Sequence, residues 1–253
     1  MNKNILCLYG HIRKNNFILH LKRIFPGFKY YLHSWDELHP CENTWHNKDN
    51  KTREYLTSKI YKYLISNIGN NNFFVESQNQ SDIRNIPASR RKYYSMKKVL
   101  DLVKEINPII LISRPDIIHH ETINLENYII KKKQILCSFD LSKNRLSKFP
   151  GAIGCTDLLL IGYKKDLIKL SNCLLKTKLS QNKYDDLEFM LNAIKGQDID
   201  LIQIGYINER DFHIWRYNSR LRLKSVFSDL KDYFYKLKSN LKIIFKINKK
   251  TFS

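Results

Sequence analysis

The sequence predicts an α/β fold in which a mostly parallel β-sheet is flanked by helices, and three observations lead to this class. From the N-terminus, short apolar segments of strand type alternate four times with segments of helical periodicity. Such alternation is typical of a parallel sheet with right-handed crossovers. Residues 109–112 are continuously apolar and mostly β-branched, as in a strand covered on both faces. With 253 residues, 43% of them hydrophobic, the chain can bury a substantial core in one domain.

Four strands and three helices are expected in the first part of the chain. The expected strands cover 5–9, 29–33, 73–75 and 109–112. Apolar residues at steps of three and four predict helices over 17–24, 56–68 and 96–106. The last of these has Met96, Val99, Leu100, Val103 and Ile106 on one face. We expect it to end at Asn107 and Pro108, because proline lacks an N–H and disfavours helical geometry in the preceding residue.

The second part of the chain continues the pattern up to residue 204 and then changes. Strands are expected over 134–139, 156–162 and 199–204, with helices over 167–174 and from Tyr184 to a glycine cap at Gly196. From Leu223 to Ile244, apolar residues step by three and four without a break, which predicts one long amphipathic helix. Residues 216–250 contain eleven basic residues against Asp229 and Asp232. Such a helix suits an anionic membrane surface, and packing on the domain or on a second subunit is the alternative.

The charge balance points to an anionic partner. The chain has 44 basic and 24 acidic residues, a net charge of +20, which fits nucleic acid, a phospholipid surface or a phosphorylated substrate. The five cysteines are widely spaced and form no C-x-x-C pair, so they suggest neither a zinc site nor a disulfide framework. No run approaches the roughly 18 apolar residues of a spanning helix. We therefore expect a cytoplasmic protein that is soluble or peripheral on the inner face of the cell membrane.

Polar residues follow several of the expected strands, at the end where open α/β sheets bind their ligands. Gly10 and Arg13 follow the first strand. A glycine allows the backbone to approach a ligand closely, and an arginine offers a planar fork of donors suited to phosphate. A tight turn with a solvated arginine is the structural alternative. After the fourth strand the chain turns polar at once, with Arg114 and Asp116. We take this corner of the sheet as the expected site.

The chain contains five short motifs in sequence order. They are G-x-x-R at Gly10 to Arg13, H-x-W-D at His33 to Asp36, an arginine-containing helix from Arg90, R-P-D at Arg114 to Asp116, and D-x-x-x-x-G at Asp157 to Gly162. In order and spacing these resemble bacterial glycosyltransferases of surface-polysaccharide synthesis, including those related to the WavE lipopolysaccharide-synthesis family. The resemblance covers about residues 5–195.

The resemblance implies a GT-A-like catalytic domain over 1–210, followed by a basic helical tail over 211–253. It also implies a nucleotide-sugar donor and a saccharide or lipid-linked acceptor. Asp116 could hold Mg²⁺ or Mn²⁺, which prefer oxygen ligands. However, Arg114 stands where the first aspartate of the usual D-x-D motif would be. Arginines could then neutralise the leaving diphosphate in place of a metal.

The resemblance and the motif positions give a set of expected site residues. The residues expected to bind substrate are Gly10, Arg13, His33, Trp35, Asp36, Arg90, Arg91 and Arg114. An inverting transfer needs a carboxylate to take the proton of the acceptor hydroxyl. The expected catalytic residues are Asp116, Asp157, Asp186 and Glu188. Among the last three, the resemblance to GT-A enzymes, which have acidic residues at a similar late position, favours Asp186 or Glu188 as the base. Structural alternatives stay open for Asp186, which could cap a helix, and for Trp35 and Asp36.

The leading interpretation is a glycosyltransferase of lipopolysaccharide or capsule synthesis, held at the membrane by its tail. One alternative is a nucleic-acid-binding protein or nuclease, favoured by net charge and by fifteen tyrosines. Against it, the basic residues concentrate in the tail and no aromatic RNA-binding motif is present. The second alternative is a catalytically inactive scaffold. Dinucleotide enzymes and P-loop kinases are disfavoured, because neither G-x-G-x-x-G nor a Walker A motif occurs.

Overall fold

The computed structural model describes residues 4–13, 16–38, 54–87, 90–139, 155–177, 186–207 and 212–214. All of them belong to one unit of the chain, Met1–Pro40 together with Lys51–Trp215. At positions 38, 54, 81, 139 and 203, and over 155–157, 186–188, 205–207 and 212–214, only the course of the backbone is described. The second unit, Cys41–Asn50 with Arg216–Ser253, lies outside the described residues, as does the expected amphipathic helix from Leu223. The division between 1–210 and 211–253 therefore stays a prediction.

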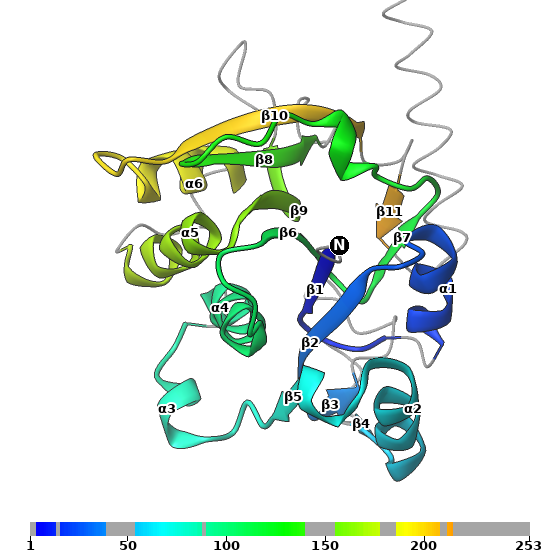
Figure 1. The fold of residues 1–253 in the computed structure, drawn as a ribbon. Coiled ribbons are helices and arrows are strands. Elements are labelled where there is room, and N and C mark those ends of the chain that lie inside the picture. The colour runs from blue at the N-terminus through cyan, green and yellow to red at the C-terminus, as the bar shows by residue number, and fades with distance from the viewer. Residues whose placement is uncertain are drawn as a thin grey trace, which may run out of the picture. The chain divides into compact units, whose positions relative to one another are not determined.

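A seven-stranded sheet forms the centre of the described unit, in the order β5-β2-β1-β6-β9-β8-β10 (Figure 1). Its strands are β1 (Ile5–Tyr9), β2 (Lys29–Trp35), β5 (Phe73–Glu76), β6 (Ile109–Ser113), β8 (Gln134–Phe139), β9 (Cys155–Tyr163) and β10 (Asp200–Ile207). Strand β9 runs antiparallel to both of its neighbours, whereas the other pairings in this sheet are parallel. Two short antiparallel ribbons add β3 (Glu37–Leu38) with β4 (Glu54–Tyr55), and β7 (Ile117–His119) with β11 (Phe212–Ile214).

Helices cover both faces of the sheet (Figure 1). The helices are α1 (Phe17–Ile24), α2 (Ser58–Ile68), α3 (Ser81–Arg84), α4 (Arg91–Leu102), α5 (Lys164–Lys176) and α6 (Asp186–Ala193), with 3₁₀ turns at Asn70–Asn72 and Leu125–Asn127. Leu6 and Leu8 of β1 pack in the core shared with α1 and α2, whereas Ile5 and Cys7 pack in the core shared with α4, α5 and α6. Successive strand residues point to opposite faces, so a strand covered on both sides must be apolar throughout. Among the described helices, none is long and apolar enough to cross a membrane.

The structure confirms the predicted α/β architecture, a Rossmann-type sheet that is mostly parallel and flanked by helices. Every strand predicted from apolar runs is present, and β6 lies between β1 and β9 in the middle of the sheet. The sequence pattern did not indicate the reversed direction of β9. Direction leaves no mark on a strand that is buried on both faces, because its residues are apolar in either orientation.

The predicted end of the helix over 96–106 was wrong. Helix α4 ends at Leu102, and Val103 already has an extended backbone with ψ of 118°. Ile106, expected on the buried face, is 98% exposed. The carboxylate of Glu105 accepts hydrogen bonds from Lys29 Nζ at 2.7 Å and Tyr31 Oη at 2.9 Å. These contacts tie the segment after α4 to the start of β2 rather than to another helical turn.

Candidate functional site

Several of the expected site segments meet at one edge of the sheet. The parallel strands β1, β2, β5 and β6 all end at this edge, which we call the carboxyl edge. Strand β9 starts there, because it runs the other way and its Leu160 pairs with Ile112 near the end of β6. Asp157 precedes Leu160 by three residues and therefore lies toward the same edge. The turn at Gly10, the end of β2 and the R-P-D segment thus come together from distant parts of the sequence.

Two arginines converge on one carboxylate at the carboxyl edge, and we call Arg13, Arg114 and Asp116 the arginine cluster. Arg114 Nε donates to Asp116 Oδ1 at 2.8 Å, and its Nη2 donates to Oδ2. Arg13 Nε lies 3.0 Å from Asp116 Oδ2. The side chain of Asp116 is 2% exposed, whereas those of Arg13 and Arg114 are 15% and 26% exposed. Asp116 therefore anchors two guanidinium groups that reach partly into solvent.

The charge state of the arginine cluster follows from its geometry. Burial alone would raise the pKa of Asp116, but the charges of Arg114 and Arg13 and the hydrogen bonds outweigh burial and hold it below its usual value. Asp116 is accordingly ionised at neutral pH. The three side chains of the arginine cluster carry two positive charges and one negative charge. This arrangement favours a ligand that carries negative charge.

A cavity of about 320 Å³ lies beside the arginine cluster. It is lined by Arg13, Phe17, His20, Arg23, Ile24 and residues Pro115 to His120. In its wall, His119 is fully buried and its Nε2 lies 3.0 Å from Ser113 Oγ. Burial, with smaller effects of His20 and His120, lowers the pKa of His119 to about 3. The imidazole of His119 is therefore neutral at physiological pH.

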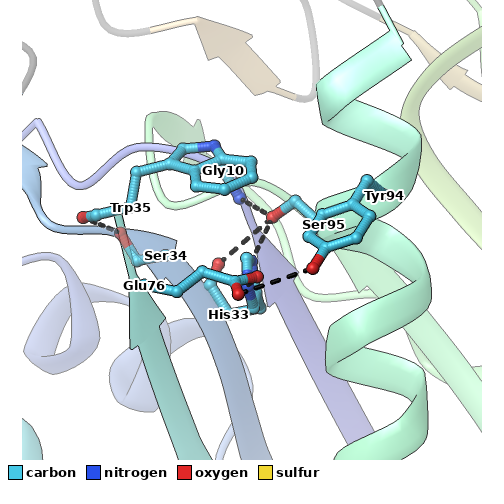
Figure 2. Close-up of polar contacts among 7 residues, drawn as sticks. All are labelled: Gly10, His33, Ser34, Trp35, Glu76, Tyr94 and Ser95. Carbon is cyan, nitrogen blue, oxygen red and sulfur yellow. Dashed lines mark hydrogen bonds and ion pairs between the residues drawn. The ribbon is translucent and has the colours of Figure 1, made fainter. Parts of the chain in front are cut away.

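A second polar group at the carboxyl edge is closed from solvent, and we call Ser95, His33 and Glu76 the buried chain (Figure 2). Ser95 Oγ lies 2.7 Å from His33 Nδ1, and His33 Nε2 lies 2.7 Å from Glu76 Oε1. Ser95 and His33 are fully buried, and Glu76 is 6% exposed. The backbone N–H of Gly10 donates to Ser95 Oγ at 3.0 Å. The chain thus joins α4, β2 and β5 to the turn that follows β1.

Aromatic side chains cover the buried chain (Figure 2). The rings of Trp35 and Tyr94 stack with centroids 6.0 Å apart and an interplanar angle of 14°. The hydroxyl of Tyr94 donates to Glu76 Oε2 at 3.4 Å. Trp35 is 2% exposed and also meets the edge of the His33 ring, with centroids 5.2 Å apart. Both His33 and Trp35, expected to bind substrate, lie in the interior rather than on an open surface.

The structure separates the two arginines at the start of α4. Arg91 donates through Nη1 to Gln78 Oε1 at 3.0 Å, and Gln78 Nε2 lies 2.9 Å from His11 Nε2. Arg91 therefore connects, through Gln78, to the turn after β1. In contrast, Arg90 Nη1 lies 3.5 Å from the carbonyl oxygen of Leu175 near the end of α5. Arg91 is thus linked to the carboxyl edge through described side chains.

The expected carboxylates lie in different situations. Asp36 follows β2, its N–H donates to the carbonyl of Glu76 at 3.0 Å, and its buried Oδ1 has no hydrogen-bond partner among the described residues. For Asp157 in β9, and for Asp186 and Glu188 in α6, the side chains lie outside the described part of the structure. The assignment of a catalytic base among these three stays a prediction.

The described residues do not fit a divalent metal ion at Asp116. Both oxygens of its carboxylate accept from guanidinium groups. Within the described part of the chain, no group of three or more His, Cys, Asp or Glu side chains is placed to hold a metal. A metal site would need either displacement of the arginines or ligands from outside the described side chains.

Sequence reasoning missed Glu76, Ser95, Tyr94, Gln78 and His11. A signal was present for Glu76, because a charged residue directly after the apolar run of β5 repeats the pattern of Asp36 after β2. Ser95 gives no such signal, since a serine inside a helix with polar neighbours is usually solvated. Only the packing of α4 against β1 and β2 brings Ser95 to this edge.

Comparisons with known proteins found similarity in backbone but not in sequence. No protein-family model and no curated protein matches the chain. A galactosyltransferase, LgtC, solved with donor and acceptor sugar analogues, is 13% identical over 79% of this chain and 72% of its own, with a TM-score of 0.44. The glycosyltransferase GlyE of Streptococcus pneumoniae TIGR4 is 15% identical over 79% of this chain and 44% of its own, with a TM-score of 0.43. With similarity this low, the assignment of a function depends on the residues of this chain.

Proposed function

We propose that the chain is a glycosyltransferase that moves a sugar from a nucleotide-sugar donor to a saccharide or lipid-linked acceptor. The observation that carries this proposal is the arginine cluster. Two arginines that follow separate strands contact one buried carboxylate at the carboxyl edge, beside a cavity of about 320 Å³. Open α/β sheets bind ligands at this edge.

The chemistry of sugar transfer explains why this arrangement is useful. The bond from the sugar to the diphosphate breaks, and negative charge develops on the leaving nucleoside diphosphate. Preorganised cationic groups in a partly buried site stabilise such charge more strongly than water does. Guanidinium groups present planar forks of donors that match phosphate oxygens. In this proposal Arg13 and Arg114 neutralise the leaving group, and Asp116 orients both.

The acceptor hydroxyl must lose a proton during transfer, and a carboxylate near the arginine cluster would take it. Asp157 is the first choice of the three expected bases, because β9 neighbours β6 and starts at the carboxyl edge. Asp186 and Glu188 on α6 are the other choices. We keep lipopolysaccharide or capsule synthesis as the proposed pathway, and a cytoplasmic location with the basic tail of 211–253 on an anionic membrane surface.

Binding of nucleotide sugars tests the proposal. A panel of UDP-, GDP-, dTDP- and CMP-sugars would be screened by thermal shift with and without Mn²⁺, and hits would be followed by calorimetry and turnover. One nucleotide class should bind without Mn²⁺. Arg114→Ala and Arg13→Ala should each weaken its binding at least about tenfold, as expected for charge-assisted hydrogen bonds. Arg84→Ala is the matched control, because Arg84 is exposed on α3 away from the cluster.

Two results would contradict this function. If no nucleotide sugar in the panel binds or turns over, the chain is not such a transferase. If binding occurs but is lost equally in the Arg84 control, the effect is one of net charge and the arginine cluster is not the donor site.

A nucleic-acid-binding function is the second candidate, and one observation favours it. A groove of about 830 Å³ lies between α5 and the turns before β8 and β10, at the opposite edge of the sheet. Its lining includes Lys132, Lys133, Lys165, Lys169 and Lys176. Retention on duplex and single-stranded nucleic acid across a salt series separates the two functions. Binding that survives physiological salt favours this candidate, and loss at moderate salt indicates counterion release alone.

A further inference from the structure

The buried chain permits one consistent arrangement of protons (Figure 2). Burial lowers the pKa of His33 despite the opposing effect of Glu76, so the ring is neutral and carries one N–H. Burial raises the pKa of Glu76, but its hydrogen bonds with His33 and Tyr94 and the charge of Lys98 act in the opposite direction, and the pKa lies below its usual value. Glu76 is therefore a carboxylate that only accepts. His33 Nε2 must then carry the proton and donate to Glu76, which leaves Nδ1 to accept from the hydroxyl of Ser95.

The Ser95 hydroxyl, which donates to His33, also accepts a hydrogen bond from the backbone N–H of Gly10. The Gly10 N–H lies 3.0 Å from Ser95 Oγ and 3.1 Å from the carbonyl oxygen of His33. Gly10 has φ of +105°, a conformation that side-chain-bearing residues rarely adopt. The N–H of Gly10 is therefore shared between two acceptors of the buried chain, in a conformation that glycine adopts without strain.

A serine, a histidine and a glutamate in series also form the pattern of a hydrolytic triad, but the burial argues against that use. A nucleophile must reach the reacting carbon of its substrate. Ser95 and His33 have no exposed surface, and the Ser95 hydroxyl lies between an imidazole nitrogen and a backbone amide. The buried chain consequently acts on the protein itself rather than on a substrate.

The Gly10 turn leads directly to the arginine cluster. Ile12 is fully buried, and the next residue, Arg13, lies 3.0 Å from Asp116. A shift of the Gly10 amide would therefore move the base of the Arg13 side chain. We propose that Ser95, His33 and Glu76 are positioning residues that fix the Gly10 turn, so that Arg13 is preorganised to meet a diphosphate. The part of this inference that concerns the diphosphate rests on the proposed function.

The experiment compares Ser95→Ala with Ser171→Ala in the full chain. Ser171 is a matched control, because it is also fully buried on a helix of the same layer but its hydroxyl donates only to Ile168 within α5. Hydrogen exchange of the segment 5–13 would be followed by mass spectrometry. Ser95→Ala should speed exchange there at least about tenfold, as for loss of one buried hydrogen bond, and Ser171→Ala should leave it unchanged. Equal exchange in both variants overturns the proposal.

Binding of UDP and GDP, measured by calorimetry, tests the second step. If the wild type binds either nucleotide, Ser95→Ala should weaken that binding about tenfold, and unchanged binding with faster exchange would overturn the positioning of Arg13. If the wild type binds neither, a donor site for uridine or guanosine diphosphate fails, while the exchange result still decides whether the buried chain fixes the turn.

A measurement on the wild type covers the case in which Ser95→Ala does not fold. The ¹⁵N shifts of the His33 ring should show a neutral imidazole protonated at Nε2 and accepting at Nδ1. An imidazolium at pH 7, or the opposite tautomer, contradicts the arrangement of the chain.

Discussion

The arginine cluster and the buried chain lie at the same edge of the sheet, and each is built around one buried carboxylate. Asp116 and Glu76 are 3% and 6% exposed. They differ in their partners, because Asp116 meets two permanent cations and Glu76 meets a neutral imidazole and a phenol. The first group contains two guanidiniums with partly exposed side chains, whereas the second keeps the negative charge of Glu76, which hydrogen bonds from His33 and Tyr94 stabilise in place. Surplus charge suits contact with a ligand, and closure suits control of the backbone.

The largest loss of stability is expected when Asp116, which contacts both guanidiniums of the arginine cluster, is removed. Asp116→Ala would leave two guanidiniums facing each other in a largely buried site. The free energy of unfolding should fall by about 3–5 kcal/mol, the range for removal of one partner from a buried ion pair. Urea unfolding measures this loss, with Asp101→Ala on the surface of α4 as the control. A loss below about 1 kcal/mol would mean that the arginine cluster is effectively solvated.

Lowering the pH affects the two groups differently, because the buried chain contains a histidine and the arginine cluster does not. Burial lowers the pKa of His33 and lowers that of nearby His119 to about 3, against about 6.5 in the unfolded chain. Below pH 6.5 the unfolded state therefore binds more protons than the folded state. Stability is complete above pH 6.5 and falls with decreasing pH, by up to about 1.4 kcal/mol per pH unit for each group.

Urea unfolding between pH 6.5 and pH 5 checks the sign and the size of this loss. His119→Gln should weaken the dependence of the unfolding free energy on pH, because it removes one of the two buried histidines. A wild-type stability that stays constant over this range would show that the histidines are protonated in the folded state.

A smaller effect is expected from the turn that joins the two groups. Gly10→Ala would place a side chain at φ of +105°, and the new Cβ would meet nothing within 4 Å. The cost is therefore backbone strain alone, about 1–3 kcal/mol. Gly196→Ala is a matched control, with φ of +75° and equally open space. Both variants should lose stability in urea unfolding, but only Gly10→Ala should also weaken nucleotide binding. Equal binding in both variants would separate the turn from the arginine cluster.

The smallest effect belongs to an ion pair that lacks the burial of either group. Lys97 and Asp101 pair at 2.6 Å on α4, with side chains 35% and 44% exposed. Such helical pairs contribute about 0.3–0.5 kcal/mol. Asp101→Asn should lower stability by no more than this, and the difference should vanish in 1 M salt, where charges are screened within about 3 Å. A larger loss would show that an exposed ion pair can also contribute strongly to stability, and burial would then not explain the large loss expected for Asp116→Ala.

The sequence predicted the strands well and their directions less well. Apolar runs such as 5–9 and 109–112 must be strands or buried helices, and their length decides for strands. The reversal of β9 is absent from that pattern. The end of α4 was also missed, because Ile106 continues the helical spacing while the contacts of Glu105 with Lys29 and Tyr31 end the helix. Those partners lie about 75 residues away in sequence, so no local pattern contains them.

For the candidate site, the sequence supplied strand ends but not the links between them. Arg13, Arg114 and Asp116 were predicted to share a site because each follows a strand. Ser95 could not be found this way, since it lies inside a helix and gains its role only from the hydrogen bonds with His33 and Gly10. A side chain that positions the backbone has no recognisable sequence pattern. Ligand-binding side chains of open α/β sheets are easier to predict, because they lie at the ends of strands.

The reversed strand also affects how the chain could vary. Strand β8 ends and β9 begins at paired residues, Phe139 and Cys155, on the edge that carries the arginine cluster. The connection between them starts and finishes at neighbouring points, so its length can change at little entropic cost to the sheet. That connection can therefore differ in length between relatives of this protein while the sheet beneath stays the same.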